Sequence, residues 1–164
     1  MGPAQCFERI EFAMTFELDI STMNLVEAIQ AKFEEVRVPI QAAMAGRFAE
    51  ICRENIGEGF VSNRPAEWPD LKPKYAKRVG RENATLFLTP DEAARVGGES
   101  GKLYNSIQVD PYGQDAAIVF SDCEYAAKQQ KTRPFFPMLN GELTPYAIAE
   151  VTAAAQREAE RILA

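Results

Sequence analysis

The chain has no histidine among its 164 residues. Histidine is the side chain most often used for proton transfer near neutral pH, and it is the commonest transition-metal ligand. Its absence excludes Ser-His-Asp and Cys-His catalytic arrangements, together with every zinc site that contains a histidine. The three cysteines, Cys6, Cys52 and Cys123, are widely spaced and form no C-x-x-C pair. This pattern is typical of reduced thiols and favours the cytoplasm over an oxidising compartment.

Long apolar runs and an excess of positive charge are missing as well. No stretch approaches the roughly 20 apolar residues that a membrane-spanning helix requires, and no signal-peptide pattern is present. We therefore expect no membrane insertion and no signal-dependent secretion. With a net charge of -6, the chain as a whole repels phosphate backbones. A protein that binds nucleic acid, with or without sequence specificity, is disfavoured.

Short patterns that look like functional sites have simpler explanations. The glycine-rich segment 97–102 ends in Lys102, but Leu103 follows where a phosphate-binding loop requires serine or threonine. Cys123 has no histidine to act as its base, so a nucleophilic role is not expected. Acidic neighbours such as Glu34 and Glu35 point in different directions on a helix, as solvated residues do. The sequence therefore predicts no enzymatic activity, no cofactor and no metal.

The N-terminal third shows two hydrophobic periods in succession. Apolar residues occupy every second position over residues 10–18, which predicts a half-buried strand. After Ser21 and Thr22 the apolar residues recur three or four apart to about residue 56, which predicts a long helix that Gly57 ends. Pro39 lies inside this helix and predicts either a kink or a break into two helices.

Residues 57–106 form an irregular excursion in which periodicity fades. Trp68 and Leu71 bring large apolar side chains into this polar stretch, so we expect them to attach it to the core. Pro73 is expected to begin a short helix. The run 89–92, Thr-Pro-Asp-Glu, is a capping box ahead of a second short helix that Gly97 ends. A further helical turn is expected at residues 103–106.

The C-terminal part predicts a hairpin and a second long helix. Residues 107–109 and 116–120 read as two strands around a Pro-Tyr-Gly turn at 111–113, followed by a short helix at 124–130. Two prolines restrict the segment 133–137 to an edge strand or a brief extended stretch. Thr144 and Pro145 are expected to start the last helix. Its predicted apolar stripe is Ile148, Val151, Ala155, Ala159 and Ile162.

These elements predict a single α+β domain over residues 1–164. A small, mostly antiparallel β-sheet would combine the N-terminal strand, the hairpin and the segment at Arg133. The long N-terminal helix and the C-terminal helix would pack on this sheet.

One stretch of the acidic chain is locally basic. Its cationic residues lie close to Trp68 and Tyr75, and they are Lys72, Lys74, Lys77, Arg78 and Arg81. Such a patch could meet an acidic protein surface or a DNA backbone in a narrow channel. The alternative is a solvated short helix beside a core tryptophan, and the sequence leaves both open.

Four short segments occur in an order that resembles a known family. They read W-P-D-L-K-P-K-Y at 68–75, S-G-K-L-Y-N-S-I at 100–107, E-Y-A-A-K-Q-Q at 124–130 and T-R-P-F-F-P at 132–137. This order is similar to that of the phage virion morphogenesis family, the tail completion proteins of Mu-like and related tailed phages. The chain departs from the family at Lys128 and Gln129, where a histidine often precedes the glutamine, and it lacks the glycine that usually follows.

The resemblance implies which residues matter and how they act. The family-motif residues, with structural or interface roles, are Trp68, Leu71, Pro73, Leu103, Ser106, Ile107, Tyr125, Gln129, Arg133, Pro134 and Phe135. From the residue chemistry, Arg133 has a planar donor at the start of a rigid segment, which predicts pairing with a carboxylate on the fold or on a neighbouring subunit.

The same resemblance implies a structural role in a tailed bacteriophage or prophage. The protein would act in virion morphogenesis, at tail completion or head-tail joining, as a ring of identical subunits in contact with other head-tail connector or tail proteins. The ring number stays open, with a hexamer suggested by the family. The protein would reside in the virion, at the tail or neck, and in the cytoplasm of the bacterial host during assembly. A tail terminator or minor tail protein is the nearest alternative role. A small non-enzymatic regulatory module that binds another protein is the alternative from a different class.

We predict that the purified protein binds neither a cofactor nor a divalent transition metal tightly, because it lacks histidine and every phosphate or metal motif. Native mass spectrometry of the protein purified without chelators should show the mass of the bare chain or of its oligomers. A stoichiometric ligand or zinc ion would contradict this prediction.

Overall fold

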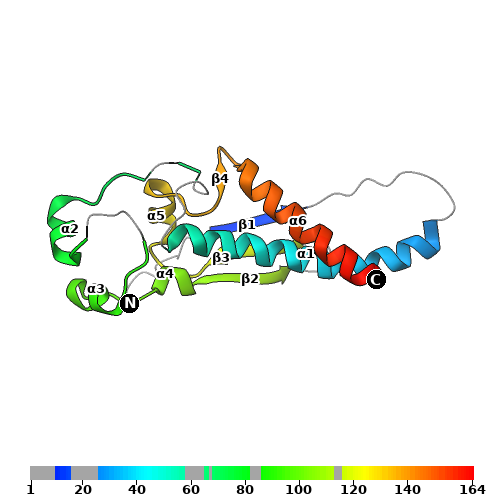
Figure 1. The fold of residues 1–164 in the computed structure, drawn as a ribbon, viewed down its shortest axis with the longest axis horizontal. Helices are drawn as coiled ribbons and strands as arrows, with labels where there is room; N and C mark the ends of the chain where they lie inside the picture. Colours follow the sequence, from blue (N-terminus) through cyan, green and yellow to red (C-terminus); the bar gives the residue numbers. More distant parts are fainter. Residues whose placement is uncertain (1–9, 16–25, 58–64, 67, 82–85, 113–115) are drawn as a thin grey trace, which may run out of the picture.

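The computed structural model describes residues 10–15, 26–57, 65–66, 68–81, 86–112 and 116–164. Figure 1 shows an elongated molecule in which the helices α1 and α6 cross beside a small sheet, with α2 and α3 at one end. The elements in chain order are β1 (Ile10–Thr15), α1 (Val26–Ile56), α2 (Pro73–Val79), α3 (Pro90–Val96), α4 (Lys102–Asn105), β2 (Ile107–Tyr112), β3 (Ala116–Ser121), α5 (Ala126–Thr132), β4 (Met138–Leu139), β5 (Glu142–Leu143) and α6 (Pro145–Leu163). The predicted α+β class, with a long first helix and a C-terminal helix, is confirmed.

The main sheet has three antiparallel strands in the order β1-β3-β2. Its central strand β3 is buried along most of its length, as expected for a strand with neighbours on both sides. The predicted hairpin is confirmed, but β2 runs on through Pro111 and Tyr112, which were predicted to form the turn. Proline is tolerated there because β2 is an edge strand. The predicted turn residue Gly113 lies outside the described residues.

The free edge of β2 offers little to a further strand. The Nη2 atom of Arg53, on α1, donates a hydrogen bond of 2.7 Å to the carbonyl oxygen of Ile107. Pro111 has no N–H group to donate. Both features reduce the number of backbone groups along this edge that are available for pairing.

The long helix α1 is continuous from Val26 to Ile56. Of the two outcomes predicted for Pro39, the break into two helices does not occur. The helix ends where Gly57 donates its backbone N–H to the carbonyl of Arg53 at 2.9 Å, as the position of the glycine predicted. The predicted caps Ser21 and Thr22 lie outside the described residues.

Helix α6 starts as predicted but buries a different stripe. The Thr144 hydroxyl accepts a hydrogen bond from the backbone N–H of Ala147, and Pro145 occupies the first turn. Against α1, the buried positions are Ala147, Val151 and Ala154, whereas Ile148 is 51% exposed. The stripe was therefore wrong at Ile148. Small alanine side chains allow the two helices to approach closely, so they occupy the contact instead of the larger residue.

The segment between α5 and α6 differs from the prediction. Helix α5 begins at Ala126, two positions later than expected, and the segment at Arg133 is not a strand of either sheet. A two-stranded hairpin, β4 and β5, follows instead. Asn140 and Gly141 at its tip have φ angles of 54° and 87°, which the favoured two-residue hairpin turns require. The Asn-Gly dipeptide was a sequence signal for this turn.

One contiguous core joins α1, the sheet, α6 and the segment after α5. Phe48, Phe135 and Phe136 are fully buried, and the ring centroid of Phe136 lies 6.0 Å from that of Phe48 and 5.0 Å from that of Phe135. Trp68 also belongs to this cluster. The core therefore contains residues from both ends of the irregular excursion and from the segment that follows α5.

Candidate functional site

Trp68 attaches the start of the excursion to the segment after α5. Its side chain is 6% exposed, and its indole Nε1 donates a hydrogen bond of 3.1 Å to the carbonyl oxygen of Pro134. The prediction that this tryptophan attaches the excursion to the core is confirmed. Two of the motif segments, which are far apart in the sequence, are in direct contact here.

Arg133 connects the same two segments through hydrogen bonds that are donated in the opposite direction. Its Nη2 atom donates to the backbone carbonyls of Pro69 at 2.9 Å and Asp70 at 3.3 Å. The predicted carboxylate partner on the fold is therefore wrong, because the guanidinium serves carbonyl groups in a segment without regular structure. Hydrogen bonds donated from each segment to the other hold the start of the excursion in place.

Two side-chain amides bind the backbone of Phe135 and Phe136, as a neighbouring strand would do in a sheet. The Oε1 atom of Gln130 accepts the backbone N–H groups of Phe135 at 2.9 Å and Phe136 at 3.0 Å. Asn55, which is fully buried in α1, donates its Nδ2 to the carbonyl of Phe135 at 2.9 Å. Buried backbone groups need such partners. We call Asn55, Trp68, Gln130, Arg133 and Phe135 the junction.

Two residues of the junction were not predicted from the sequence. The predicted motif residue Gln129 lies half-buried on α5, whereas its neighbour Gln130 makes the backbone contacts. Asn55 was not predicted either. An asparagine between Cys52 and Ile56, on the apolar side of a helix, was the signal that a buried polar group had a specific partner.

The motif around Ser106 closes the turn from α4 into β2. Leu103 and Ile107 are buried, and the Ser106 hydroxyl donates to the Leu103 carbonyl at 2.7 Å. The hydroxyls of Ser106 and Ser121 are 2.6 Å apart, and Ser121 Oγ accepts the backbone N–H of Cys123 at 3.2 Å. Because the Ser106 hydroxyl proton is used toward Leu103, the Ser121 hydroxyl donates to Ser106. Each donor in this series of hydrogen bonds is then used once.

Two groups that could carry chemistry are held in their protonated forms. Burial raises the pKa of the Cys52 thiol well above its usual value. Burial, followed by a hydrogen bond with Cys123, raises the pKa of the Tyr125 hydroxyl. An activated nucleophile requires the opposite shift. The environments of these residues therefore suit packing.

Helices α2 and α3 are joined by reciprocal contacts at their C-terminal ends. Arg78 of α2 donates from Nε to the carbonyl of Arg95 and from Nη2 to that of Val96, both at 3.1 Å. Arg95 of α3 donates in turn to the carbonyl of Val79 at 3.0 Å. The last carbonyls of a helix lack partners within it, and cations are favourable there. Each helix thus caps the other.

A partly buried ion pair adds a second connection between these helices. The Nη1 atom of Arg81 lies 2.8 Å from the Oε2 atom of Glu92, and each side chain is 14% exposed. Glu92 also accepts the backbone N–H of Thr89, whose hydroxyl accepts that of Glu92. The predicted capping box is confirmed. Through Glu92, this box is linked to the residue that follows α2.

The predicted basic patch is divided by these contacts. Arg78 and Arg81 are engaged within the fold. Lys72, Lys74 and Lys77 are exposed, and none has a side-chain hydrogen bond or ion pair within the described parts of the chain. We call these three residues the lysine surface. Pro73 begins α2 as predicted, and half-buried Leu71 lines an open groove of about 600 Å³ beside it.

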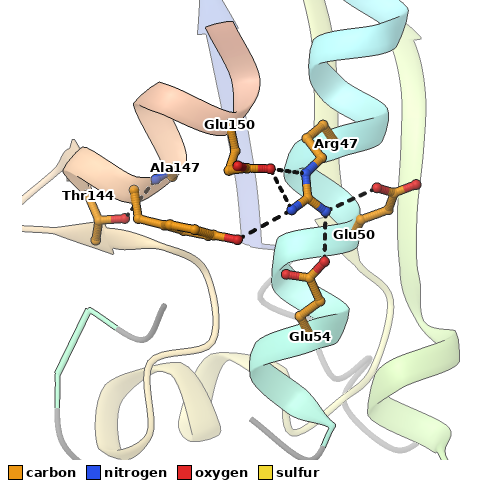
Figure 2. Close-up of polar contacts among 7 residues, drawn as sticks. Arg47, Glu50, Glu54, Thr144, Ala147 and Glu150 are labelled. Atoms are coloured by element: carbon orange, nitrogen blue, oxygen red, sulfur yellow. Dashed lines mark hydrogen bonds and ion pairs between the residues drawn. The ribbon is translucent and has the colours of Figure 1, made fainter. Parts of the chain in front are cut away.

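A cluster of charges connects α1 and α6 (Figure 2). Arg47 donates to Glu150 at 2.9 Å and to Glu54 at 2.7 Å, and its Nη1 lies 3.2 Å from Glu50. Three carboxylates against one guanidinium leave a formal charge of -2. Burial lowers the pKa of Arg47, but the hydrogen bonds to Glu54 and Glu150 outweigh it and raise that pKa above its usual value.

We call these four residues, Arg47, Glu50, Glu54 and Glu150, the Arg47 cluster. The cluster was not predicted from the sequence. Arg47, Glu50 and Glu54 are spaced three and seven residues apart, so they lie on one side of a helix, and this spacing was the available signal. The partner Glu150 lies about a hundred positions away, where no local pattern points to it.

Within the described ranges, no three histidine, cysteine, aspartate or glutamate side chains are placed to hold a metal ion. In the same ranges, no helix is both long and apolar enough to cross a membrane. Comparisons with known proteins find no matching family model, no matching curated protein and no matching solved structure. The assignment to a phage family remains a prediction from the motif residues.

Replacement of Trp68 should show how strongly the excursion depends on the junction. Trp68→Ala leaves a cavity and removes the donor to Pro134, so the free energy of unfolding should fall by about 3–5 kcal/mol. Trp68→Phe keeps most of the apolar area and should lose about half as much or less. Urea unfolding followed by circular dichroism measures both. A loss below about 1 kcal/mol for the alanine variant would place the ring at the surface.

Replacement of Arg47 should test the connection between α1 and α6. Arg47→Leu leaves three carboxylates without their cation, so we expect a loss of about 1–3 kcal/mol, between the values for exposed and buried pairs. The control is Arg161→Leu, because Arg161 pairs with Glu158 on the surface of α6 alone. It should leave the free energy of unfolding nearly unchanged. Equal losses in the two variants would show that the Arg47 cluster contributes no more than a surface pair.

Proposed function

We propose that the protein is a non-enzymatic structural component of a tailed bacteriophage or prophage. It acts in virion morphogenesis, at tail completion or head-tail joining, as a ring of identical subunits. The observation that carries the proposal is the junction, where two of the four family-like segments are in contact through Trp68, Pro134 and Arg133. These residues hold two distant segments of the chain together. Members of a family that have such residues in common would share a structural framework and not a catalytic site.

The chemistry of the described residues supports a structural role over a catalytic one. Cys52 and Tyr125 are held protonated by burial, so neither is an activated nucleophile. Arg47 and Arg81 are matched by carboxylates and connect elements of the fold. The polar groups that sequence reasoning brought forward are therefore used to hold backbone segments together.

Self-association is supported by the exposed lysine surface. Figure 1 places α2, which carries two of the three lysines, at one end of the molecule beyond α5. A ring joins subunits head to tail, so each contact needs two different and complementary surfaces on every copy. Three exposed cations on a chain of net charge -6 are suited to one side of such a contact. The other head-tail connector or tail proteins of the phage would bind the assembled ring.

The parent protein should form an oligomer larger than a dimer as its concentration rises. Size-exclusion chromatography with light scattering measures the mass, and negative-stain electron microscopy should show rings. Mass spectrometry of virions purified from a host that carries the gene should detect the chain.

The opposite results would be equally clear. A protein that stays monomeric alone and with phage tails or capsids, and that is absent from virions, is not a ring component. A tight complex with one unrelated soluble host protein would favour the regulatory module instead.

A further inference from the structure

Resting on this proposed function, we infer which two surfaces join neighbouring subunits. The lysine surface of one copy docks on the carboxylates of the Arg47 cluster of the next copy. The proposal names a second copy of this chain as the partner of α2. It also replaces the basic patch of five residues by the three exposed lysines, because Arg78 and Arg81 are engaged within the fold.

The lysine surface is built on a rigid support. Pro73 occupies the first turn of α2, and the contacts of Arg78 and Arg95 join the C-terminal ends of α2 and α3. Arg81 and Glu92 hold the following residues. Because α2 is already ordered by α3, binding loses little backbone entropy there. Tyr75, 39% exposed between the lysines, adds apolar area to this surface.

The receiving surface combines excess negative charge with fixed positions. The exposed fractions of the Glu50, Glu54 and Glu150 side chains are 61%, 34% and 35%, so all three reach solvent while Arg47 holds them. Other ion-pair groups among the described residues have a smaller excess. Lys102 is shared by Glu99 and Glu124, and Glu158 pairs with Arg161. Among these ion-pair groups, the Arg47 cluster has the largest excess of negative charge, and we infer that the lysines bind there.

The two surfaces lie on different parts of one molecule. Figure 1 shows α2 at one end of the molecule, and Figure 2 shows the carboxylates at the contact between α1 and α6. A contact between such distinct surfaces is heterologous, which is the type that generates a ring. Charge pairing at the contact sets encounter and register, and its strength falls as salt screens it.

Two charge-reversed proteins test the inference directly. The first is Lys74→Glu with Lys77→Glu, and the second is Glu50→Lys with Glu54→Lys. Each variant alone has one reversed and one parental surface, so like charges face each other. Association at low salt should weaken at least tenfold, as estimated from the cost of like-charge contacts. Mixed in equal amounts, the two variants should associate, because every contact between unlike copies then joins opposite charges.

A matched control separates this contact from the effect of net charge. Lys128→Glu with Lys131→Glu changes the net charge by the same amount on α5, where both lysines are exposed. It should assemble as the parent does. Circular dichroism and thermal unfolding establish that each variant is folded. If the lysine substitutions at Glu50 and Glu54 disturb folding, Glu50→Gln with Glu54→Gln removes the charge without repulsion and should still weaken association.

The outcomes distinguish this inference from the proposed function. If the parent assembles but folded variants of either surface assemble equally well, or if the mixture fails to recover assembly, these surfaces are not the contact and the ring stands. If Lys74→Glu with Lys77→Glu abolishes binding to duplex DNA and leaves assembly unchanged, the lysine surface serves DNA and the inference is overturned. A parent that never assembles and is absent from virions removes the proposed function itself.

Discussion

Burial of Phe135 and Phe136 brings their polar backbone into the core, while prolines on both sides keep the segment out of a sheet. Those backbone groups need partners, and Gln130 and Asn55 provide them. With the segment held in this way, the carbonyl of Pro134 is in place to accept the indole of Trp68. The hydrogen bonds to this segment therefore position the start of the excursion, which leads into α2.

The charged residues divide into those that build the fold and those left for other uses. Arg47 and Arg81 connect separate elements through carboxylates, and Arg53, Arg78, Arg95 and Arg133 serve backbone carbonyls. The planar guanidinium, with several donors in fixed directions, is well suited to both tasks. Lysine has a single flexible charge and takes little part in this framework. The division between arginine and lysine therefore follows their chemistry, and it leaves the lysines of α2 exposed.

Features with local causes could be predicted from the sequence, and features with distant causes could not. The capping box at Thr89, the start of α6 at Thr144 and the end of α1 at Gly57 each depend on a few neighbouring residues. Burial of Trp68 followed from its isolation in a polar stretch. The partner of Arg133, the role of Gln130 and the exposure of Ile148 depend on segments that meet only in the folded chain. In a seven-residue helix such as α2, periodicity also does not tell which cations face the fold.

The partly blocked edge of β2 affects how copies of the chain behave at high concentration. A long, open edge strand is a template on which identical chains add strand after strand, and such growth has no natural end. Here Arg53 occupies the carbonyl of Ile107, and Pro111 has no N–H to offer. Fibrous growth along β2 is thereby discouraged. Contacts between copies are then made by side chains. Such contacts can form a closed ring, and they can dissociate when two copies bind in an incorrect arrangement.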